Sequence, residues 1–491
     1  MEYILLQIII IPIIAAIICA LLGKKLGKNL GWIVFAILLY TSLLMLKIGI
    51  DILSGKGPLY EEYRWTTAIF DVKFGFLADG LSLPVALIMN IICAVCAIFS
   101  INVIEHRVEE LYGKENKGMY SVYFSVYLLF VIGLIGIPLS ANLILIYLFM
   151  ELVIIPLYVM LDMFAYIDRH RVAMMYFIWN HIGAAMFLIG IALLFSITGN
   201  FEISSLKIAS YNEMGFWICL FILIGWLIKM ATFGFHVWLP YAHGEHPVAA
   251  IIAIVVGLGN YVLVRLLYME MFNIFKIFAF PLLIIAIITM IYGAFLTLAQ
   301  DDVKRLYAAS TISQTAYSIL GIATLTSMGI VGGIFYFLSH ILGKSVLLSV
   351  AGILICQTGL RDIRKMGGLA KKMPLTATLC IMGAMVLSAF PPLSGFQGEW
   401  IMFVGVFKEA DSIIGLTVAL VAIFATFLTV IYSFWPALRI FFGPLPKELE
   451  NVKEAPLSMT IPLFFLMLIS FIMGIYPGPL VNMLNSVIVG S

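Results

Sequence analysis

The stretch "WLIKMATFGFHVWLPYAHGEHP", from Trp226 to Pro247, decides how this chain folds. It begins like an apolar helix that crosses a membrane, but it soon contains a lysine, three histidines, a glutamate and two prolines. Proline removes a backbone donor and interrupts a helix, and lipid tolerates such a break only inside protein or beside a water-filled cavity. The stretch therefore predicts a broken membrane helix that holds a buried lysine, Lys229.

The composition indicates that lipid surrounds most of the chain. Of its 491 residues, 63% are hydrophobic and 11% are charged, whereas soluble domains carry about 25% charged residues. The net charge of +2 gives no reason to expect nucleic acid as a partner. The connections between apolar stretches are much shorter than a soluble domain. We therefore expect no cofactor and no redox centre in this chain, and we expect its energy to come from partner subunits or an ion gradient.

The apolar stretches predict an all-α polytopic membrane protein. A membrane-spanning helix needs about 20 apolar residues, and the chain contains about fourteen such stretches. They lie near residues 3–22, 30–50, 77–101, 119–139, 141–164, 172–198, 214–235, 247–268, 273–299, 303–325, 329–357, 374–410, 413–442 and 458–477. A weakly alternating segment at residues 57–76 predicts a short external hairpin before the third helix.

The basic residues predict how these helices are oriented. Eighteen of the 28 lysines and arginines lie in alternate connections, and seven lie in the opposite ones. The positive-inside rule places the first set in the cytoplasm. We therefore expect a multi-pass protein of a prokaryotic cytoplasmic membrane, with both termini outside.

A second interrupted helix lies in "LSAFPPLSGFQGEW", residues 387–400, where Pro391, Pro392 and Gly395 break the pattern. The first break is expected around Gly234 to Pro240. The two breaks fall in the seventh and twelfth helices, five helices apart. Paired broken helices of this kind are typical of inverted repeats with ion sites at mid-depth.

Four charged side chains lie within the predicted spans: Glu151, Lys229, Lys344 and Glu399. Each costs about 2.5–3.5 kcal/mol or more at the centre of a bilayer, so they must pair or contact water. One interpretation is structural pairing between helices. The other is proton transfer, because burial disfavours the charged form and a nearby opposite charge favours it. Arg265 lies nearer a helix end, so we expect its side chain to extend to the membrane surface.

Two histidines are candidates for a proton relay. His340 precedes Lys344 by four residues and shares its helix face, and His243 borders the first break. A neutral imidazole can pass a proton between its two nitrogens. The "HGEH" motif lacks the spacing and the further ligands of a zinc site, so we expect no metal. Asp301 and Asp302 are expected to cap the tenth helix, and Lys304 and Arg305 are expected to anchor it at the cytoplasmic surface.

Several motifs resemble one family. They are "ADGLSLP" from Ala78, "FMELVIIPLY" around Glu151, "KMATFGFHVWLPYAHGEHP" from Lys229, "QDDVKRLYAASTISQ" from Gln300, "SHILGKSVL" around Lys344 and "PPLSGFQGEW" ending at Trp400. The chain resembles the antiporter-like subunits shared by respiratory complex I, Mrp-type cation/proton antiporters and membrane-bound hydrogenases.

The resemblance implies two inverted five-helix repeats, at residues 119–272 and 273–442. Three helices and the hairpin (1–118) precede these repeats, and a fourteenth helix (443–491) follows them. It also implies that Glu151 and Lys229 form a coupling pair, that Lys344 lies on a central polar axis, and that Glu399 occupies a position held by lysine in several relatives. The implied partners are other membrane subunits, including further antiporter-like subunits, and a redox module.

Two positions depart from the family pattern. Gly257 stands where many relatives carry a lysine in the eighth helix, and Gln314 stands where some carry a histidine.

From the resemblance as a whole we expect a proton-translocating subunit of a complex I-related assembly, such as a hydrogenase, sulfur-reducing or quinone-reducing type. Two alternatives stay open: a sodium/proton antiporter subunit of an Mrp-type complex, and a structural membrane subunit that does not pump. Residue types alone do not distinguish protons from sodium.

Overall fold

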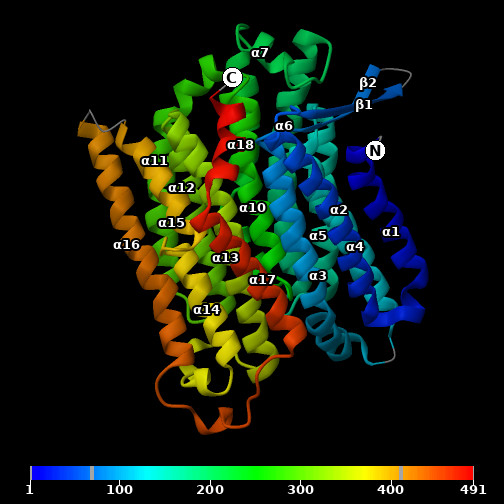
Figure 1. The fold of residues 1–491 in the computed structure, drawn as a ribbon, viewed down its shortest axis with the longest axis vertical. Coiled ribbons are helices and arrows are strands. Elements are labelled where there is room, and N and C mark those ends of the chain that lie inside the picture. The colour runs from blue at the N-terminus through cyan, green and yellow to red at the C-terminus, as the bar shows by residue number, and fades with distance from the viewer. Residues whose placement is uncertain (1–2, 67–70, 115, 409–412, 490–491) are drawn as a thin grey trace.

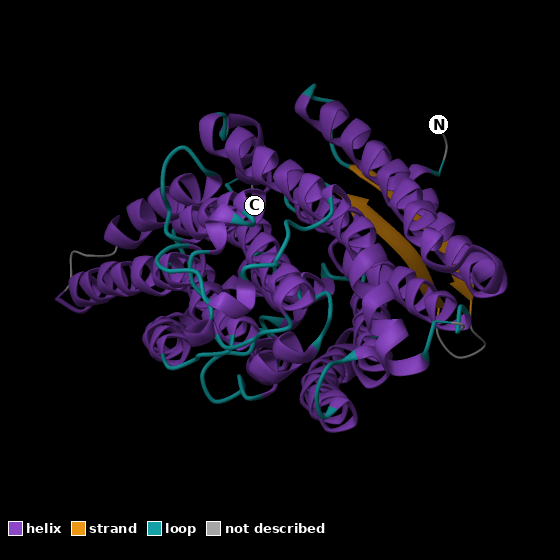
Figure 2. Cartoon of the chain, turned by 90° about the horizontal axis from the view of Figure 1, so that it is seen from below, coloured by secondary structure: helices purple, strands orange, loops and turns teal. Residues whose placement is uncertain are grey.

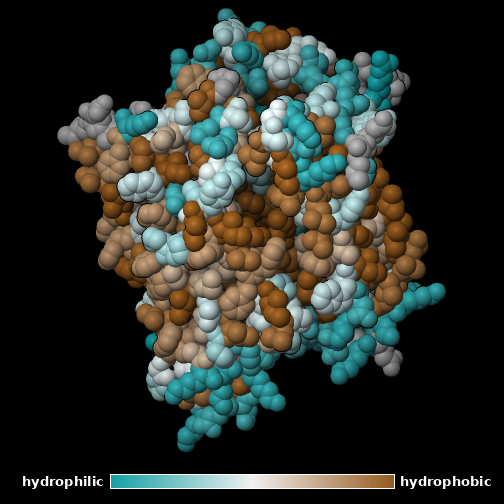
Figure 3. All heavy atoms as spheres, in the orientation of Figure 1, coloured by the Kyte–Doolittle hydropathy of each residue, from teal (hydrophilic) through white to brown (hydrophobic). Residues whose placement is uncertain are grey.

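The computed structural model describes residues 3–66, 71–114, 116–408 and 413–489. Within these ranges, ten helical stretches are long and apolar enough to cross a membrane, and two shorter apolar helices accompany them. Figure 1 shows that most helices run along the long axis of the molecule. Figure 3 shows a hydrophobic band across the middle of this face, with hydrophilic side chains gathered at both ends. The chain is a multi-pass membrane protein, as its composition predicts.

The N-terminal part contains six helices and the predicted hairpin. The helices are α1 (Ile4–Leu26), α2 (Leu30–Leu53), α3 (Ser82–Tyr112), α4 (Gly118–Leu139), α5 (Leu143–Phe164) and α6 (Arg169–Thr198). Strands β1 (Leu59–Thr66) and β2 (Asp71–Ala78) pair antiparallel, with Leu59 opposite Ala78. In Figure 2 this hairpin lies at one side of the bundle, against the N-terminal helices. Glu61 fixes it there, since its carboxylate accepts hydrogen bonds from the first amides of α1, Leu5 and Leu6, at 3.0 Å each.

Both predicted breaks are present, at slightly different residues. The seventh span consists of α8 (Gly215–Lys229) and α9 (Trp238–Glu245), so its break covers residues 230–237. Pro240 lies inside α9, because proline is tolerated in the first turn of a helix. The twelfth span consists of α14 (Pro374–Leu387) and α15 (Ser394–Lys408), and Gly395 lies inside α15. The prolines in the sequence correctly indicated both breaks. Lys229, the lysine of the first motif, is the last residue of α8.

The other spans follow the predicted ranges. They are α10 (Ala250–Val262) continued by the π-helix η2 (Leu263–Tyr268), α11 (Phe272–Leu298), α12 (Val303–Ala323), α13 (Ser327–Thr358), α16 (Ile413–Phe441) and α17 (Leu457–Ile475). Short elements join them: η1 (Gly27–Asn29), α7 (Ser205–Ala209), η3 (Ile363–Lys365), η4 (Leu369–Lys371), η5 (Lys447–Leu449) and α18 (Gly478–Ile488). The prediction ended the third helix at residue 101, which is wrong, because α3 continues through a charged segment to Tyr112.

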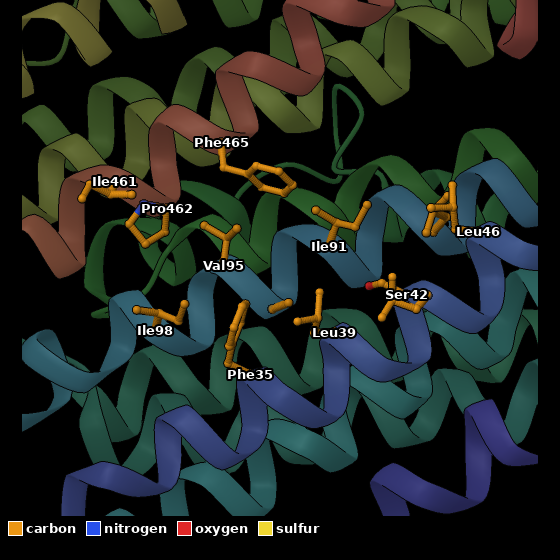
Figure 4. A pocket seen from close by; sticks show the side chains of 13 residues that line it. Phe35, Leu39, Ser42, Leu46, Ile91, Val95, Ile98, Ile461, Pro462 and Phe465 are labelled. Carbon is orange, nitrogen blue, oxygen red and sulfur yellow. The ribbon is translucent and has the colours of Figure 1, made fainter.

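The centre of the bundle is more polar than its outer face. Almost every residue of α12 and α13 is buried, including serines, threonines, a glutamine, a histidine and two lysines. Large apolar side chains instead cover the outside. A groove of about 500 Å³ on that outside lies between α2, α3 and α17 (Figure 4). Its lining is apolar, with Phe35, Ile91 and Phe465 among its residues, and it holds no titratable group. The polar core, and not this groove, therefore positions the candidate site.

Candidate functional site

The break between α8 and α9 places Lys229 at the end of a membrane helix. Ala231 and Gly234 take positive φ angles of 52° and 91°, which are incompatible with a right-handed helix and interrupt it. The break frees backbone groups that lipid could not satisfy. Nearby side chains satisfy some of them: the Trp238 indole donates to the Ile228 carbonyl at 3.3 Å, and Thr289 accepts from the Phe233 amide at 3.1 Å. The break is therefore only partly covered by the protein, since Phe233 and Val237 are each 45% exposed, whereas Lys229 at the end of α8 is buried.

Lys229 is almost completely buried, with 1% of its surface exposed. Within the described residues, its ammonium has no hydrogen-bond partner. Glu151 is the carboxylate near enough to stabilise its charge, yet no oxygen of Glu151 lies within the 4.0 Å that defines an ion pair among these residues. The two residues implied as a coupling pair are thus electrostatic neighbours, and they are not in direct contact here.

The ionisable side chain within ion-pair distance of Glu151, among the described residues, is a histidine that the sequence analysis did not select. His181 Nδ1 on α6 lies 3.6 Å from Glu151 Oε1 on α5. Half of the His181 side chain is exposed, against 17% of the Glu151 side chain. Its ring stacks on Phe177, with 5.2 Å between ring centroids. The four-residue spacing of Phe177 and His181 was visible in the sequence, but nothing there indicated that α5 would bring Glu151 to the same place.

The second half contributes a fully buried lysine with a different environment. Lys344 on α13 donates to the Tyr307 carbonyl at 3.2 Å and to the Ser310 hydroxyl, both on α12. His340 lies one turn earlier on α13, and His243 on α9 is close enough for the charge of Lys344 to act on it. The structure therefore gathers three of the predicted site residues, from two distant parts of the chain, around one point.

The two histidines of this group have free nitrogens. Within the described part of the chain, His340 Nε2 and both nitrogens of His243 meet no hydrogen-bond partner. The Ile252 backbone amide faces the His243 ring without reaching hydrogen-bond geometry. Buried polar atoms are normally satisfied by protein or by ordered water. These nitrogens are therefore free to donate or accept a hydrogen bond.

Gly257 shows why a lysine is missing from the eighth helix. A Cβ atom at this position would lie 2.1 Å from Cε2 of Phe337 and 2.4 Å from its Cδ2. Helices α10 and α13 thus approach closely here, and the Phe337 ring fills the space that a longer side chain would need. The departure from the family pattern is accommodated by packing.

Glu399 on α15 is the last of the predicted site residues along the chain. It is 5% exposed, and its Oε1 accepts a hydrogen bond from the Thr426 hydroxyl at 2.5 Å, while Oε2 has no partner within the described residues. A polar network lies beside it. Gln314 donates to Tyr432 at 2.6 Å and accepts from Tyr336 at 2.6 Å, and Tyr317 contacts Thr429 at 3.0 Å. Gln314 therefore keeps a hydrogen-bonding link in this part of the core.

Two basic residues do not behave as the sequence suggested. Arg265 was expected to reach the membrane surface, but it is buried and binds both carboxylate oxygens of Asp79 at 2.6 Å. Asp79 in turn accepts from the amides of Leu81 and Ser82 at the start of α3. Lys304 was expected to anchor at the cytoplasmic surface, but it is 0% exposed. The expected cap is confirmed, since Asp302 accepts from the amides of Lys304 and Arg305.

Among the described residues, no group of three or more histidine, cysteine, aspartate or glutamate side chains is arranged to hold a metal ion. The six cysteines are free thiols.

A family model described as "NADH:quinone oxidoreductase/Mrp antiporter, TM" matches residues 140–429. The chain belongs to this family. The matched region contains all six predicted site residues: Glu151, Lys229, His243, His340, Lys344 and Glu399.

Curated relatives and a solved structure agree with this assignment. The chain is 26% identical over 459 residues to NADH-quinone oxidoreductase subunit M of Rickettsia prowazekii, covering 92% of this chain and 89% of the relative. It is 29% identical over 443 residues to F(420)H(2) dehydrogenase subunit M of Methanosarcina mazei, covering 87% and 85%. A chain of the Mrp complex from Dietzia sp. DQ12-45-1b has the same fold, with a TM-score of 0.86, 19% identity, and coverage of 100% and 98%.

Proposed function

We propose that this protein is a proton-translocating membrane subunit of a complex I-related respiratory assembly. The observation that carries the proposal is that Lys229, His243, His340, Lys344 and Glu399 are titratable side chains buried within the helical bundle, each at most 5% exposed. Intramembrane groups of this kind are costly and are typical of proton relays. Relatives that are subunits M of NADH-quinone oxidoreductase and of F(420)H(2) dehydrogenase support the assignment to such an assembly.

The separation of Lys229 from Glu151 supplies a mechanism for coupling. Two unit charges at about 4 Å interact by roughly 4 kcal/mol where the effective dielectric constant is about 20, and by about 1 kcal/mol in water. A change in the distance or charge of Glu151 therefore changes how strongly Lys229 holds its proton. Partner redox chemistry would act on this carboxylate, and Lys229 would release or regain a proton in response.

Proton transfer would then continue through the centre of the bundle. Protons enter from the cytoplasm, charge the Lys229 and Lys344 positions, and leave near Glu399. Gly257 occupies the position of the eighth-helix lysine found in many relatives. His243 and His340, whose charges interact with that of Lys344, take over its role. Buried hydroxyls of Ser345 and Ser349 on α13, which meet no partner among the described residues, would help to order water along this route.

The proposed arrangement includes the two inverted repeats, residues 119–272 and 273–442, with one broken helix in each. It also includes both termini outside a prokaryotic cytoplasmic membrane. The basic residues in alternate connections support this orientation. The partners are other membrane subunits and a redox module, because this chain is expected to carry no electron carrier.

Lys229→Ala, in the assembled complex reconstituted into vesicles, tests the function. We expect at least a tenfold loss of proton pumping per turnover, because alanine cannot carry the proton that Glu151 controls. Lys207→Ala is the matched control, since Lys207 is an exposed lysine of the same half. Normal pumping by the assembled Lys229→Ala complex would leave the protein as a structural subunit.

A sodium/proton antiporter subunit is the second candidate. The fold match to a chain of an Mrp complex favours it. The same vesicles distinguish the two functions. Pumping that is independent of sodium supports proton translocation alone, whereas pumping that requires a sodium gradient supports antiport.

A further inference from the structure

The C-terminal end of α9 is held by residues from the other half of the chain. The last carbonyls of a helix have no partner within that helix. Here the Gly244 carbonyl accepts from Arg361 Nη2 at 2.9 Å, and the carbonyls of His246 and Pro247 accept from Lys304 Nζ at 2.7 and 3.1 Å. Lys304 lies in the first turn of α12, and Arg361 follows α13. Two cations from the second half thus cap the broken helix of the first half.

Lys304 and Arg361 belong to a larger, partly buried charge cluster. The Glu245 carboxylate, 1% exposed, pairs with Arg361 at 2.9 Å and with Arg305 at 3.4 Å. Arg361 also binds Asp302, the cap of α12, at 2.6 Å.

Tyr166, in the turn after α5, lies at the centre of the same cluster. Lys304 Nζ is 4.5 Å from the centroid of its ring, and Arg361 is 5.8 Å from it. Its amide donates to the Glu245 carbonyl at 3.0 Å. A lysine that anchored a helix at the membrane surface would be hydrated. Lys304 instead donates its hydrogen bonds to the backbone carbonyls that follow α9.

The segment that these cations hold carries His243. This histidine lies on α9, one residue before Gly244, and it is near enough to Lys344 and His340 of α13 for their charges to act on one another. Neither ring nitrogen is tied by a hydrogen bond within the described residues. The position of the ring therefore depends on the backbone of α9, and that backbone is fixed by Lys304 and Arg361.

We propose that Lys304 and Arg361 are positioning residues for proton transfer. They hold the junction between α9 and α10 so that His243 stays beside His340 and Lys344. This inference rests on the proposed function, because it assigns the two cations a role in the same proton route. Neither residue touches the transferred proton, and each acts through His243.

Lys304→Met and Arg361→Met test the inference, with pumping measured per turnover in the assembled complex. Both variants keep the side-chain stem and remove the donors. We expect at least a tenfold loss of pumping, with faster hydrogen exchange of the amides in residues 242–252 and unchanged exchange in α4.

Arg364→Met is the control for both variants. Arg364 lies three residues beyond Arg361, is 59% exposed, and pairs with Asp301 and Asp362. Its hydrogen bonds lower the pKa of Asp362 to about 2.

A double variant separates positioning from general structural support. If Lys304 acts through His243, Lys304→Met adds nothing to the loss caused by His243→Gln, because residues coupled through one backbone segment have non-additive effects. Losses that multiply, or pumping within twofold of the native level in Lys304→Met, overturn the inference. Failure of every Lys304 and Arg361 variant to assemble, Lys304→Arg included, also overturns it in favour of a structural role.

The outcomes also distinguish this inference from the proposed function. Normal pumping by Lys229→Ala contradicts the function itself. Loss of pumping in Lys229→Ala and in His243→Gln, together with normal pumping in Lys304→Met, contradicts only the positioning role.

Discussion

Lys229 and Lys344 are both buried, but their immediate surroundings differ. Lys344 donates to a carbonyl and a hydroxyl of α12, which stabilise an ammonium without adding an opposite charge. The Lys229 ammonium has no hydrogen-bond acceptor among the described residues. Its charge is compensated by the Glu151 carboxylate, which it does not contact directly. A buried charge that loses its compensation is strongly unfavourable. At the residue scale, the two lysines therefore differ in what compensates their charge: a carbonyl and a hydroxyl at Lys344, and the Glu151 carboxylate at Lys229.

Gly257 gives a prediction about packing at the same scale. Gly257→Ala should lower the free energy of unfolding by about 1–3 kcal/mol, because overpacking a filled core forces neighbours to move. The added Cβ would overlap the Phe337 ring. Thermal unfolding of the purified complex in detergent measures this change.

Gly478→Ala is the matched control for Gly257, since no atom lies within 4 Å of a Cβ built there. Equal melting temperatures for both variants would show that α10 and α13 are not in the close contact described here. Phe337→Ala combined with Gly257→Ala should recover part of the lost stability, because it removes the overlapping ring.

At the scale of elements, the broken helices are the features that the sequence predicts best. Proline and glycine interrupt a helix for local reasons, so "GFHVWLP" and "AFPPLSG" indicated both breaks. The exact ends moved by a few residues, because Pro240 and Gly395 fit inside a first turn. The external hairpin was also predicted correctly, since alternation and turn residues are local patterns too.

The charged residues were harder to place, for a physical reason. Hydropathy gives the position of a residue along its helix, but it does not tell which neighbour the side chain faces. Lys304 and Arg265 both looked like residues that reach water. Their true partners, the carbonyls after α9 and the Asp79 carboxylate, lie 57 or more residues away in the chain. The pairing of His181 with Glu151 was missed in the same way.

At the scale of the whole molecule, the outer face of α5 and α6 is unusual. His181 exposes half of its side chain near the middle of a membrane helix, beside Glu151 and among apolar residues such as Ile178 and Ile182. Lipid offers no hydrogen bond to an imidazole, and ionisable groups in membranes face protein or water. We therefore expect another membrane subunit to cover this face in the assembled complex.

A bulky substitution tests that expectation. Ile182→Trp should reduce recovery of the complete complex several-fold, because it enlarges the surface on which the partner packs. Ile17→Trp on α1 is the control, since Ile17 is also exposed to the membrane, at 58% against 43% for Ile182. Native gel electrophoresis of detergent extracts reports recovery. Full recovery of the Ile182→Trp complex would mean that lipid, and not a partner, covers α5 and α6.

The central claim is that protons cross the membrane along the buried titratable groups, and Lys344→Met tests it most directly. Methionine keeps the length and burial of the side chain and removes its proton. Proton transport per turnover is measured in vesicles with the assembled complex. The control is Lys365→Met, at an exposed lysine of η3, the short element that follows α13. We predict at least a tenfold loss in Lys344→Met and none in Lys365→Met. Native proton transport by the Lys344→Met complex would contradict the account.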